Sequence, residues 1–213
     1  MSFEKGAGKE HLDKDFLEEL KHKIWSTKGT RFTADNRLKT ILKYSNLSNS
    51  FLSGYLIIFG LISVYNLSNE NIVSANILAF SITAISILSL VFSLIESGNT
   101  YTLKAKNFHD CALELSDLYN ELQIFKTYKK EIASLDETMI FTEQLQKKYQ
   151  SILEKYENHL PIDNALFKVK HSDYYKKTTA LQKITVHINY FYITRFWYLI
   201  MIFLPIAITL III

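Results

Sequence analysis

The sequence predicts an all-α membrane protein with an N-terminal two-span transmembrane hairpin, a long cytoplasmic antiparallel helical hairpin and a C-terminal third transmembrane helix. First, residues 44–69, 71–95 and 196–213 lack Asp, Glu, Lys and Arg, although the 213-residue chain holds 24 basic and 21 acidic residues. About 20 apolar residues in a helix cross the ~30 Å hydrocarbon layer of a bilayer. Second, apolar side chains recur every three or four positions between the second and third stretches, which is typical of packed helices. Third, basic residues flank the stretches unevenly, and this asymmetry predicts an orientation.

These features divide the chain into five segments. We expect cytoplasmic amphipathic and basic helices in residues 1–43, the two-span transmembrane hairpin in 44–97, the cytoplasmic helical hairpin in 98–161, a basic juxtamembrane segment in 162–195 and the C-terminal transmembrane helix in 196–213. The single cysteine excludes a disulfide framework within the chain.

The first segment is expected to hold two helices. Residues 9–25 place apolar side chains four apart, with acids early and bases late, as suits the dipole of an amphipathic helix. We interpret Gly29 as a helix stop, after which residues 31–43 resume a basic helical pattern that runs into the first span. This basic stretch fits either a contact with nucleic acid or anionic lipid or a positively charged cytoplasmic flank, and we favour the flank.

The flanking charges predict the direction of each span. Five basic residues between 28 and 43 precede the first span, against one acid, whereas the turn after that span contains only Glu70. Lys104 and Lys106 follow the second span, and a further basic run ending at Arg195 precedes the third. Because positive flanks stay in the cytoplasm, we expect the N-terminus and residues 96–195 to be cytoplasmic and the turn at Glu70 to lie outside.

Small and hydroxyl residues lie at helical spacing in both spans of the transmembrane hairpin. In the first span they are Ser50, Ser53, Gly54, Gly60 and Ser63. In the second span they form a stripe, extended at its cytoplasmic end by an acid: Thr83, Ser86, Ser89, Ser93, Glu96 and Ser97. Small residues allow helices to pack closely in a membrane, whereas hydroxyls can line the water of an oligomeric pore. We take the second set as candidate pore-lining residues and leave the packing interpretation open.

The segment between the second and third spans is expected to form two long helices. The first carries an apolar seam that we take as a candidate oligomerisation seam: Phe108, Cys111, Leu115, Leu118, Leu122 and Phe125. Lys129 and Lys130 end this seam, and Ser134 followed by two acids is typical of a helix N-cap. Apolar residues at the same spacing run to Tyr156 in the second helix, which must end before Pro161 because proline disfavours a helical residue in front of it.

The C-terminal segment joins an aromatic border to an apolar end. Tyr190, Tyr192, Trp197 and Tyr198 lie on both sides of Arg195, as in the aromatic belts of membrane interfaces. Residues 196–213 measure only ~27 Å as a helix, and Pro205 is expected to kink it. Whether this helix crosses the bilayer or lies in its interface stays open at this point.

No catalytic or metal-binding pattern stands out in the sequence. A glycine-rich phosphate loop, HExxH and CxxC are absent. His109 and Asp110 precede Cys111, but neighbouring helix positions point apart and Cys111 falls on the apolar seam, so we interpret it as a buried structural cysteine. The spans also lack the intramembrane charges that transporters and membrane enzymes use. We therefore expect a protein without enzymatic activity and without a cofactor or metal.

Three stretches, taken in order, resemble the SLATT domain family of two-transmembrane effectors associated with nucleotide-signal systems. They are RFTADNRLKTILKYS before the first span, AKNFHDCALELSDLYNELQIF after the second, and YQSILEKYENHLPID further on. The resemblance covers roughly residues 10–165. The additional C-terminal span is similar to the branch of the family that accompanies reverse transcriptases.

This resemblance implies a bacterial antiphage effector that permeabilises the inner membrane once a sensor detects infection. The sensor would act in trans, either as a reverse transcriptase with its non-coding RNA and a nucleic-acid product or as a nucleotide-signal system. Our leading interpretation is a homo-oligomeric, pore-forming effector of abortive infection in the bacterial inner membrane. The alternative is a non-toxic membrane scaffold that recruits a cytoplasmic enzyme or nucleoprotein through its helical stalk.

Overall fold

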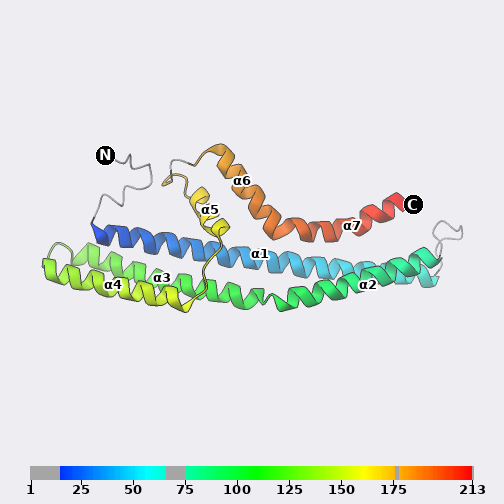
Figure 1. Cartoon of the computed structure of the whole chain (residues 1–213), viewed down its shortest axis with the longest axis horizontal. Helices are drawn as coiled ribbons and strands as arrows, with labels where there is room; N and C mark the ends of the chain where they lie inside the picture. The colour runs from blue at the N-terminus through cyan, green and yellow to red at the C-terminus, as the bar shows by residue number, and fades with distance from the viewer. Residues whose placement is uncertain (1–14, 66–74, 176–177, 213) are drawn as a thin grey trace. The chain divides into compact units, whose positions relative to one another are not determined.

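A computed structural model describes residues 15–65, 75–175 and 178–212, and within these ranges the chain contains helices and no strand. The predicted turn at Glu70 and residues 9–14 of the predicted helix over residues 9–25 lie outside the described residues. In chain order the elements are α1 (Phe16–Tyr65), α2 (Ala75–Gly98), α3 (Tyr101–Tyr128), α4 (Leu135–Lys155), α5 (Pro161–Lys170), α6 (Ala180–Phe191), the π-helical turn η2 (Tyr192–Phe196) and α7 (Trp197–Ile212) (Figure 1).

The predicted fold class is confirmed, because the described chain is all-helical and contains three helices long and apolar enough to cross a membrane. These candidate spans fall within Phe16–Val64, Ala79–Tyr128 and Ala180–Ala207. The chain forms two compact units. The helical unit comprises Met1–Leu38 and Leu103–Tyr190, and the membrane unit comprises Lys39–Thr102 and Phe191–Ile213.

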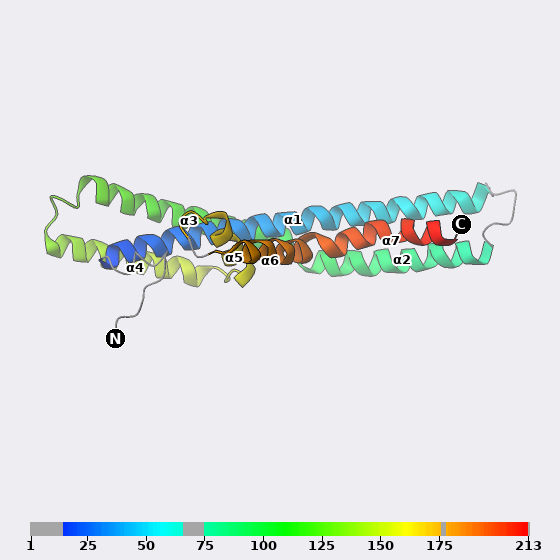
Figure 2. The same ribbon diagram turned by 90° about the horizontal axis from the view of Figure 1, so that it is seen from above.

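The core of the helical unit lies among the first part of α1, α3 and α4, which run side by side (Figures 1 and 2). Leu20 and Ile24 of α1 pack there with Leu145 of α4. Ion pairs join α3 to α4 in an antiparallel arrangement: Lys148 Nζ lies 2.7 Å from Glu121 Oε1, and Lys155 pairs with Glu114. The predicted helical hairpin is therefore present, and α1 completes it as a three-helix core.

The six residues of the candidate oligomerisation seam lie inside this core. Their side chains are buried within the single chain: Phe108, Cys111, Leu115, Leu118, Leu122 and Phe125. Burying a large apolar side chain contributes ~1.5–3 kcal/mol to folding, so these residues stabilise the chain's own fold. Packing within one chain accounts for the burial of these residues, and their role in assembly stays a prediction.

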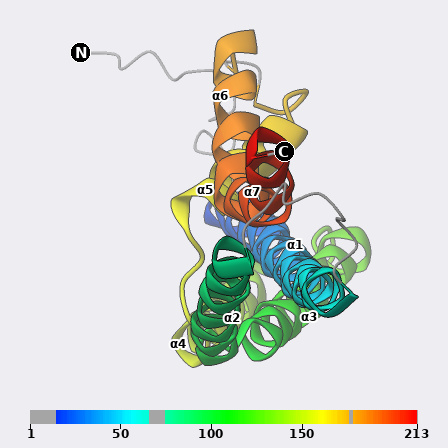
Figure 3. The ribbon, with the colours of Figure 1, turned by 90° about the vertical axis from the view of Figure 1, so that its right-hand side faces the viewer.

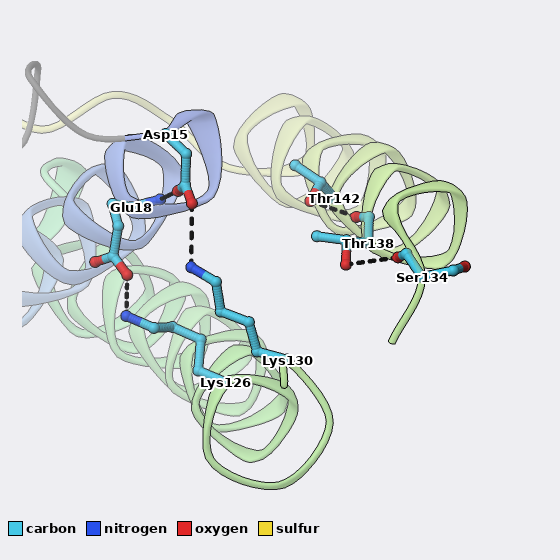
Figure 4. Close-up of polar contacts among 7 residues, drawn as sticks. All are labelled: Asp15, Glu18, Lys126, Lys130, Ser134, Thr138 and Thr142. Atoms are coloured by element: carbon cyan, nitrogen blue, oxygen red, sulfur yellow. Dashed lines mark hydrogen bonds and ion pairs between the residues drawn. The ribbon is translucent and has the colours of Figure 1, made fainter. Parts of the chain in front are cut away.

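The connection between α3 and α4 follows the predicted cap. The Ser134 Oγ accepts a hydrogen bond from the Glu137 backbone N–H, and the Glu137 carboxylate accepts one from the Ser134 backbone N–H. Figure 4 shows this end of the unit, where Lys130 lies 3.1 Å from Asp15 at the start of α1. Asp15 also accepts a hydrogen bond from the Glu18 backbone N–H, and that bond, with the Lys130 ammonium, lowers the pKa of the Asp15 carboxyl.

The predicted helix stop at Gly29 is wrong, because Gly29 lies inside the uninterrupted helix α1. A Cβ atom at position 29 would overlap the ring of Phe167 on α5. Phe167 is 3% exposed and also packs edge-on against Trp25, with ring centroids 5.0 Å apart. Gly29 therefore provides the space in which α5 approaches α1, and glycine costs only ~1 kcal/mol in a helix interior.

The membrane unit contains the later part of α1, α2, η2 and α7 (Figure 3). The Tyr55 hydroxyl donates to the Ile202 carbonyl oxygen at 2.7 Å, and the Ser48 hydroxyl reaches the Tyr198 carbonyl oxygen at 3.1 Å. Pro205 lies inside α7, which continues around it. These side-chain hydrogen bonds join α7 to α1, and hydrogen bonds of this kind commonly hold helices together in membrane proteins.

Candidate functional site

In the membrane unit, a polar contact between Asn49 on α1 and Ser93 on α2 joins the two helices. The Ser93 hydroxyl donates to the Asn49 Oδ1 atom at 2.8 Å. Phe92, the residue before Ser93, is 8% exposed and meets the Tyr198 ring edge-on. One predicted stripe residue therefore performs helix packing, the role that the alternative interpretation gave to the whole stripe.

A cavity of about 270 Å³ lies beside this contact. The Tyr198 hydroxyl donates to Glu96 Oε2 at 3.2 Å at its edge. The lining residues are mostly polar: Leu42, Ser45, Asn46, Asn49, Phe92, Ser93, Glu96, Ser97, Thr100, Tyr101 and Thr102. A cavity with several hydroxyls, amides and a carboxylate offers water or a cation many oxygen partners.

The other stripe residues lie elsewhere on α2. Thr83 and Ser86 are exposed, and their hydroxyls donate to the Ala79 and Ile82 carbonyl oxygens at 2.9 and 2.8 Å. Ser89 is half-buried. The predicted set is thus divided. Thr83 and Ser86 in the middle of α2 are exposed, whereas Ser93 and Glu96 bond to side chains of other helices.

A buried ion pair in the helical unit was not predicted from the sequence. Arg37 of α1 donates from Nε to Asp163 Oδ1 at 2.8 Å and from Nη2 to Asp163 Oδ2 at 3.2 Å. The side chains are 7% and 0% exposed. Asp163 Oδ2 also accepts a hydrogen bond from the Leu160 backbone N–H at 3.0 Å, which caps the start of α5. Asp163 therefore both pairs with α1 and begins α5.

Arg31, two turns earlier on α1, holds the segment between α4 and α5. Its guanidinium donates to the Glu157 carbonyl oxygen, lies 3.4 Å from Asn158 Oδ1 and sits over the Phe108 ring at 5.5 Å. His159 is half-buried in the same place, and its partial burial together with the Arg31 charge lowers the pKa of its imidazole. Arg31 and Arg37 together fix the α4–α5 junction to α1.

The basic stretch 31–43 is therefore only partly a charged flank. Arg31 and Arg37 are 1% and 5% exposed, so neither presents its charge to nucleic acid or lipid from this fold. Asp35, on the same stretch, lies 3.1 Å from His109 Nδ1. The signal that could have revealed the ion pair is the acid two residues after Pro161, at a position where side chains cap a helix.

Among the described residues, no three His, Cys, Asp or Glu side chains gather in a way that would hold a metal ion. Cys111 is fully buried, as its place on the seam predicted. The fold and these contacts define a class: an all-helical membrane protein with two apolar hairpin helices, an attached helical unit and an apolar C-terminal helix.

The chain belongs to the SMODS and SLOG-associating 2TM effector domain family 5, whose family model matches residues 13–211. This match confirms the resemblance to the SLATT family and extends it over α7. The name of the family describes its members as effector domains with two transmembrane helices. No curated protein and no solved structure was found to match the chain.

Proposed function

We propose that this protein is a membrane effector of a bacterial antiphage defence system, which oligomerises to permeabilise or depolarise the inner membrane when a partner sensor triggers it. The family match, the three candidate spans and the outward hydroxyls of α2 support this proposal. The sensor acts in trans, as a reverse transcriptase with its RNA or as a nucleotide-signal system. A copurifying protein from the native host, identified by mass spectrometry, distinguishes these two sensors.

The observation that carries the proposal is the exposure of Thr83 and Ser86 on α2. A helix surface that faces only lipid gains nothing from hydroxyls, and a hydroxyl oxygen bonded to its own helix still accepts a hydrogen bond from water. Several copies that turn this surface toward a common axis would give a wall of hydroxyls between apolar rings. Such a wall conducts when it is wet and closes by dewetting.

Removing these two hydroxyls with little change in the size of the side chains tests the proposal. Thr83→Val with Ser86→Ala is expected to insert and accumulate like the wild type but to abolish depolarisation in cells that carry the native neighbouring genes and are infected by phage. A potential-sensitive dye gives the readout. Ser81→Ala is the matched control, since Ser81 bonds back to the Ile77 carbonyl oxygen in the same way but lies on another face of α2. Undiminished depolarisation in the double variant would show that the conducting wall lies elsewhere.

The proposal also places the helical unit in the cytoplasm, as the flanking charges indicate. In a variant with Cys111 replaced by alanine, a cysteine at Asn69 should react with an impermeant thiol reagent added to intact cells. A cysteine at Thr138, half-buried in the first turn of α4, should react only after the cells are opened. Labelling at Thr138 in intact cells would reverse the orientation.

A recruiting scaffold is the second candidate function, and the α3–α4 connection favours it. Ile132 and Leu135 are each 85% exposed there, beside a cavity of about 660 Å³ lined in part by Ile124 and Phe141. An exposed apolar patch of this kind is typical of a protein-binding surface. Ile132→Asp with Leu135→Asp should abolish recruitment of a cytoplasmic partner to the membrane. A scaffold would show this loss without any membrane depolarisation by the wild type, whereas an effector depolarises.

A further inference from the structure

The helix α6 exposes an apolar stripe that its own unit does not cover. Leu181, Ile184 and Ile188 are 77%, 56% and 62% exposed, and Phe191 continues the row at 39%. At ~100° per residue these four positions occupy an arc of roughly 80° on one side of the helix. None of the residues of α6 is buried, although this is an amphipathic helix with an apolar face.

The opposite side of α6 attaches it to the helical unit. Lys183, Val186 and Tyr190 are half-buried and lie roughly 150° around the helix from the stripe. The Lys183 Nζ atom donates to the Ser172 hydroxyl at 2.9 Å. The helical unit thus holds α6 by its inner side, and the apolar stripe faces outward.

The chain around α6 indicates what covers this stripe. α6 continues through η2 into α7, and the candidate span Ala180–Ala207 includes α6 and most of α7. Residues 180–212 would measure ~50 Å as one straight helix, far more than the ~30 Å hydrocarbon layer. Residues after Arg195 are uncharged and fill most of that layer, so α6 lies beyond it, next to the headgroups.

The residues at this junction suit a membrane surface. Tyr192 and Trp197 are 46% and 53% exposed, and aromatic rings of this kind gather at membrane interfaces. The turn η2 is π-helical, and π-bulges are among the few features that bend a long helix. A bend at η2 allows α6 to lie in the plane of the membrane while α7 enters it. Exposed Lys168 and Lys170 at the end of α5 add positive charge.

We propose that α6 is an interfacial anchor, whose apolar stripe rests in the headgroup and acyl boundary of a phospholipid bilayer. Interfacial helices bury their apolar face ~5–10 Å into this boundary and place basic residues near anionic headgroups. Continuity with α7 favours lipid over a second copy or a partner protein, because the stripe begins where the chain leaves the hydrocarbon. This role is separate from pore formation and requires no trigger.

The test measures which solvent each side of α6 meets in the full-length protein. Single cysteines at Ile184 and Ile188 on the stripe, and at Gln182 and Asn189 on the exposed polar side, are introduced with Cys111 replaced by alanine and labelled with a small fluorophore. Each variant is reconstituted in vesicles of phosphatidylcholine and phosphatidylglycerol. Quenching is then measured with a lipid carrying a nitroxide near its headgroup and with aqueous iodide.

We expect the lipid nitroxide to quench most of the fluorescence at positions 184 and 188 and iodide to quench it little, with the reverse result at 182 and 189. Iodide quenching at all four positions would overturn the proposal, because the stripe would face water. Protection of positions 184 and 188 from both quenchers would also overturn it, since protein would cover the stripe. Lipid quenching at all four would place α6 in the hydrocarbon instead.

Discussion

The buried pair of Arg37 and Asp163 makes the stability of α5 depend on a single carboxylate charge. Asp163→Asn removes the charge but leaves an amide oxygen that can still accept from the Leu160 backbone N–H. Arg37, 5% exposed, then remains charged in the core without its ionic partner. Breaking a buried pair in this way costs ~3–5 kcal/mol.

This loss is measurable as hydrogen exchange of the backbone amides of α5, which reports local opening. If α5 opens by itself, a cost of ~3–5 kcal/mol accelerates exchange by roughly 10²- to 10⁴-fold, since ~1.4 kcal/mol is a factor of ten. Asp163→Ala also removes the cap and should add ~1 kcal/mol. Asp173→Asn, a change at an exposed acid shortly after α5, serves as the control and should leave exchange unchanged.

The double variant Arg37→Met with Asp163→Asn separates the charge from the packing. It removes the uncompensated arginine, so α5 should exchange more slowly than in Asp163→Asn alone, because apolar replacements of buried pairs are often tolerated. Equal exchange in the wild type and in Asp163→Asn would refute the reasoning. It would mean that the ion pair contributes nothing to holding α5 on α1.

Three further predictions follow from the helical unit. Gly29→Ala should displace Phe167 and destabilise the fold by the ~1–3 kcal/mol typical of overpacking, which lowers the thermal unfolding temperature in detergent. Gly54→Ala, whose added Cβ would meet open space, should not lower it; equal temperatures for the two variants would contradict the close approach of α5. Leu115→Asp with Leu122→Asp should abolish the helical circular dichroism of the unit, because it places carboxylates at fully buried positions. Leu113→Asp, at a position that is 47% exposed, should fold; a folded but smaller particle in the double variant would support the oligomer interpretation of the seam. The lowered pKa of His159 means that the unfolded chain binds a proton first as the pH falls below the ordinary value of 6.5. The full stability of the folded protein should therefore be present above pH 6.5 and fall below it. The stability of the His159→Gln variant should fall less, and identical pH profiles of stability in the wild type and the variant would exclude this histidine as the cause.

Helical periodicity predicted most of the helices but not what each face touches. The spacing from Phe108 to Phe125 identified an apolar face correctly, yet spacing cannot tell whether a face meets another copy or helices of the same chain. Here α1 and α4 supply the cover. Gly29 was misread for a related reason, since local propensity favours a stop while the ring of Phe167, far away in sequence, requires the missing side chain.

The polar residues were harder still. The stripe on α2 was predicted from its spacing, but the bond from Ser93 to Asn49 depends on how α1 and α2 pair, which the sequence does not contain. Arg37 and Asp163 lie 126 positions apart in the sequence. Each looked like an ordinary surface charge, because burial of a charge becomes visible only once its partner is placed.

The full burial of Cys111 gives the natural chain an internal reporter. It is the single thiol of the protein and lies at the centre of the three-helix core, with no exposed surface. A thiol reagent can reach it only when α1, α3 and α4 separate, so the rate of modification in untreated protein measures how often the core opens. Any signal that loosens these helices would be recorded chemically at this one sulfur atom, in the unmodified sequence and in living cells.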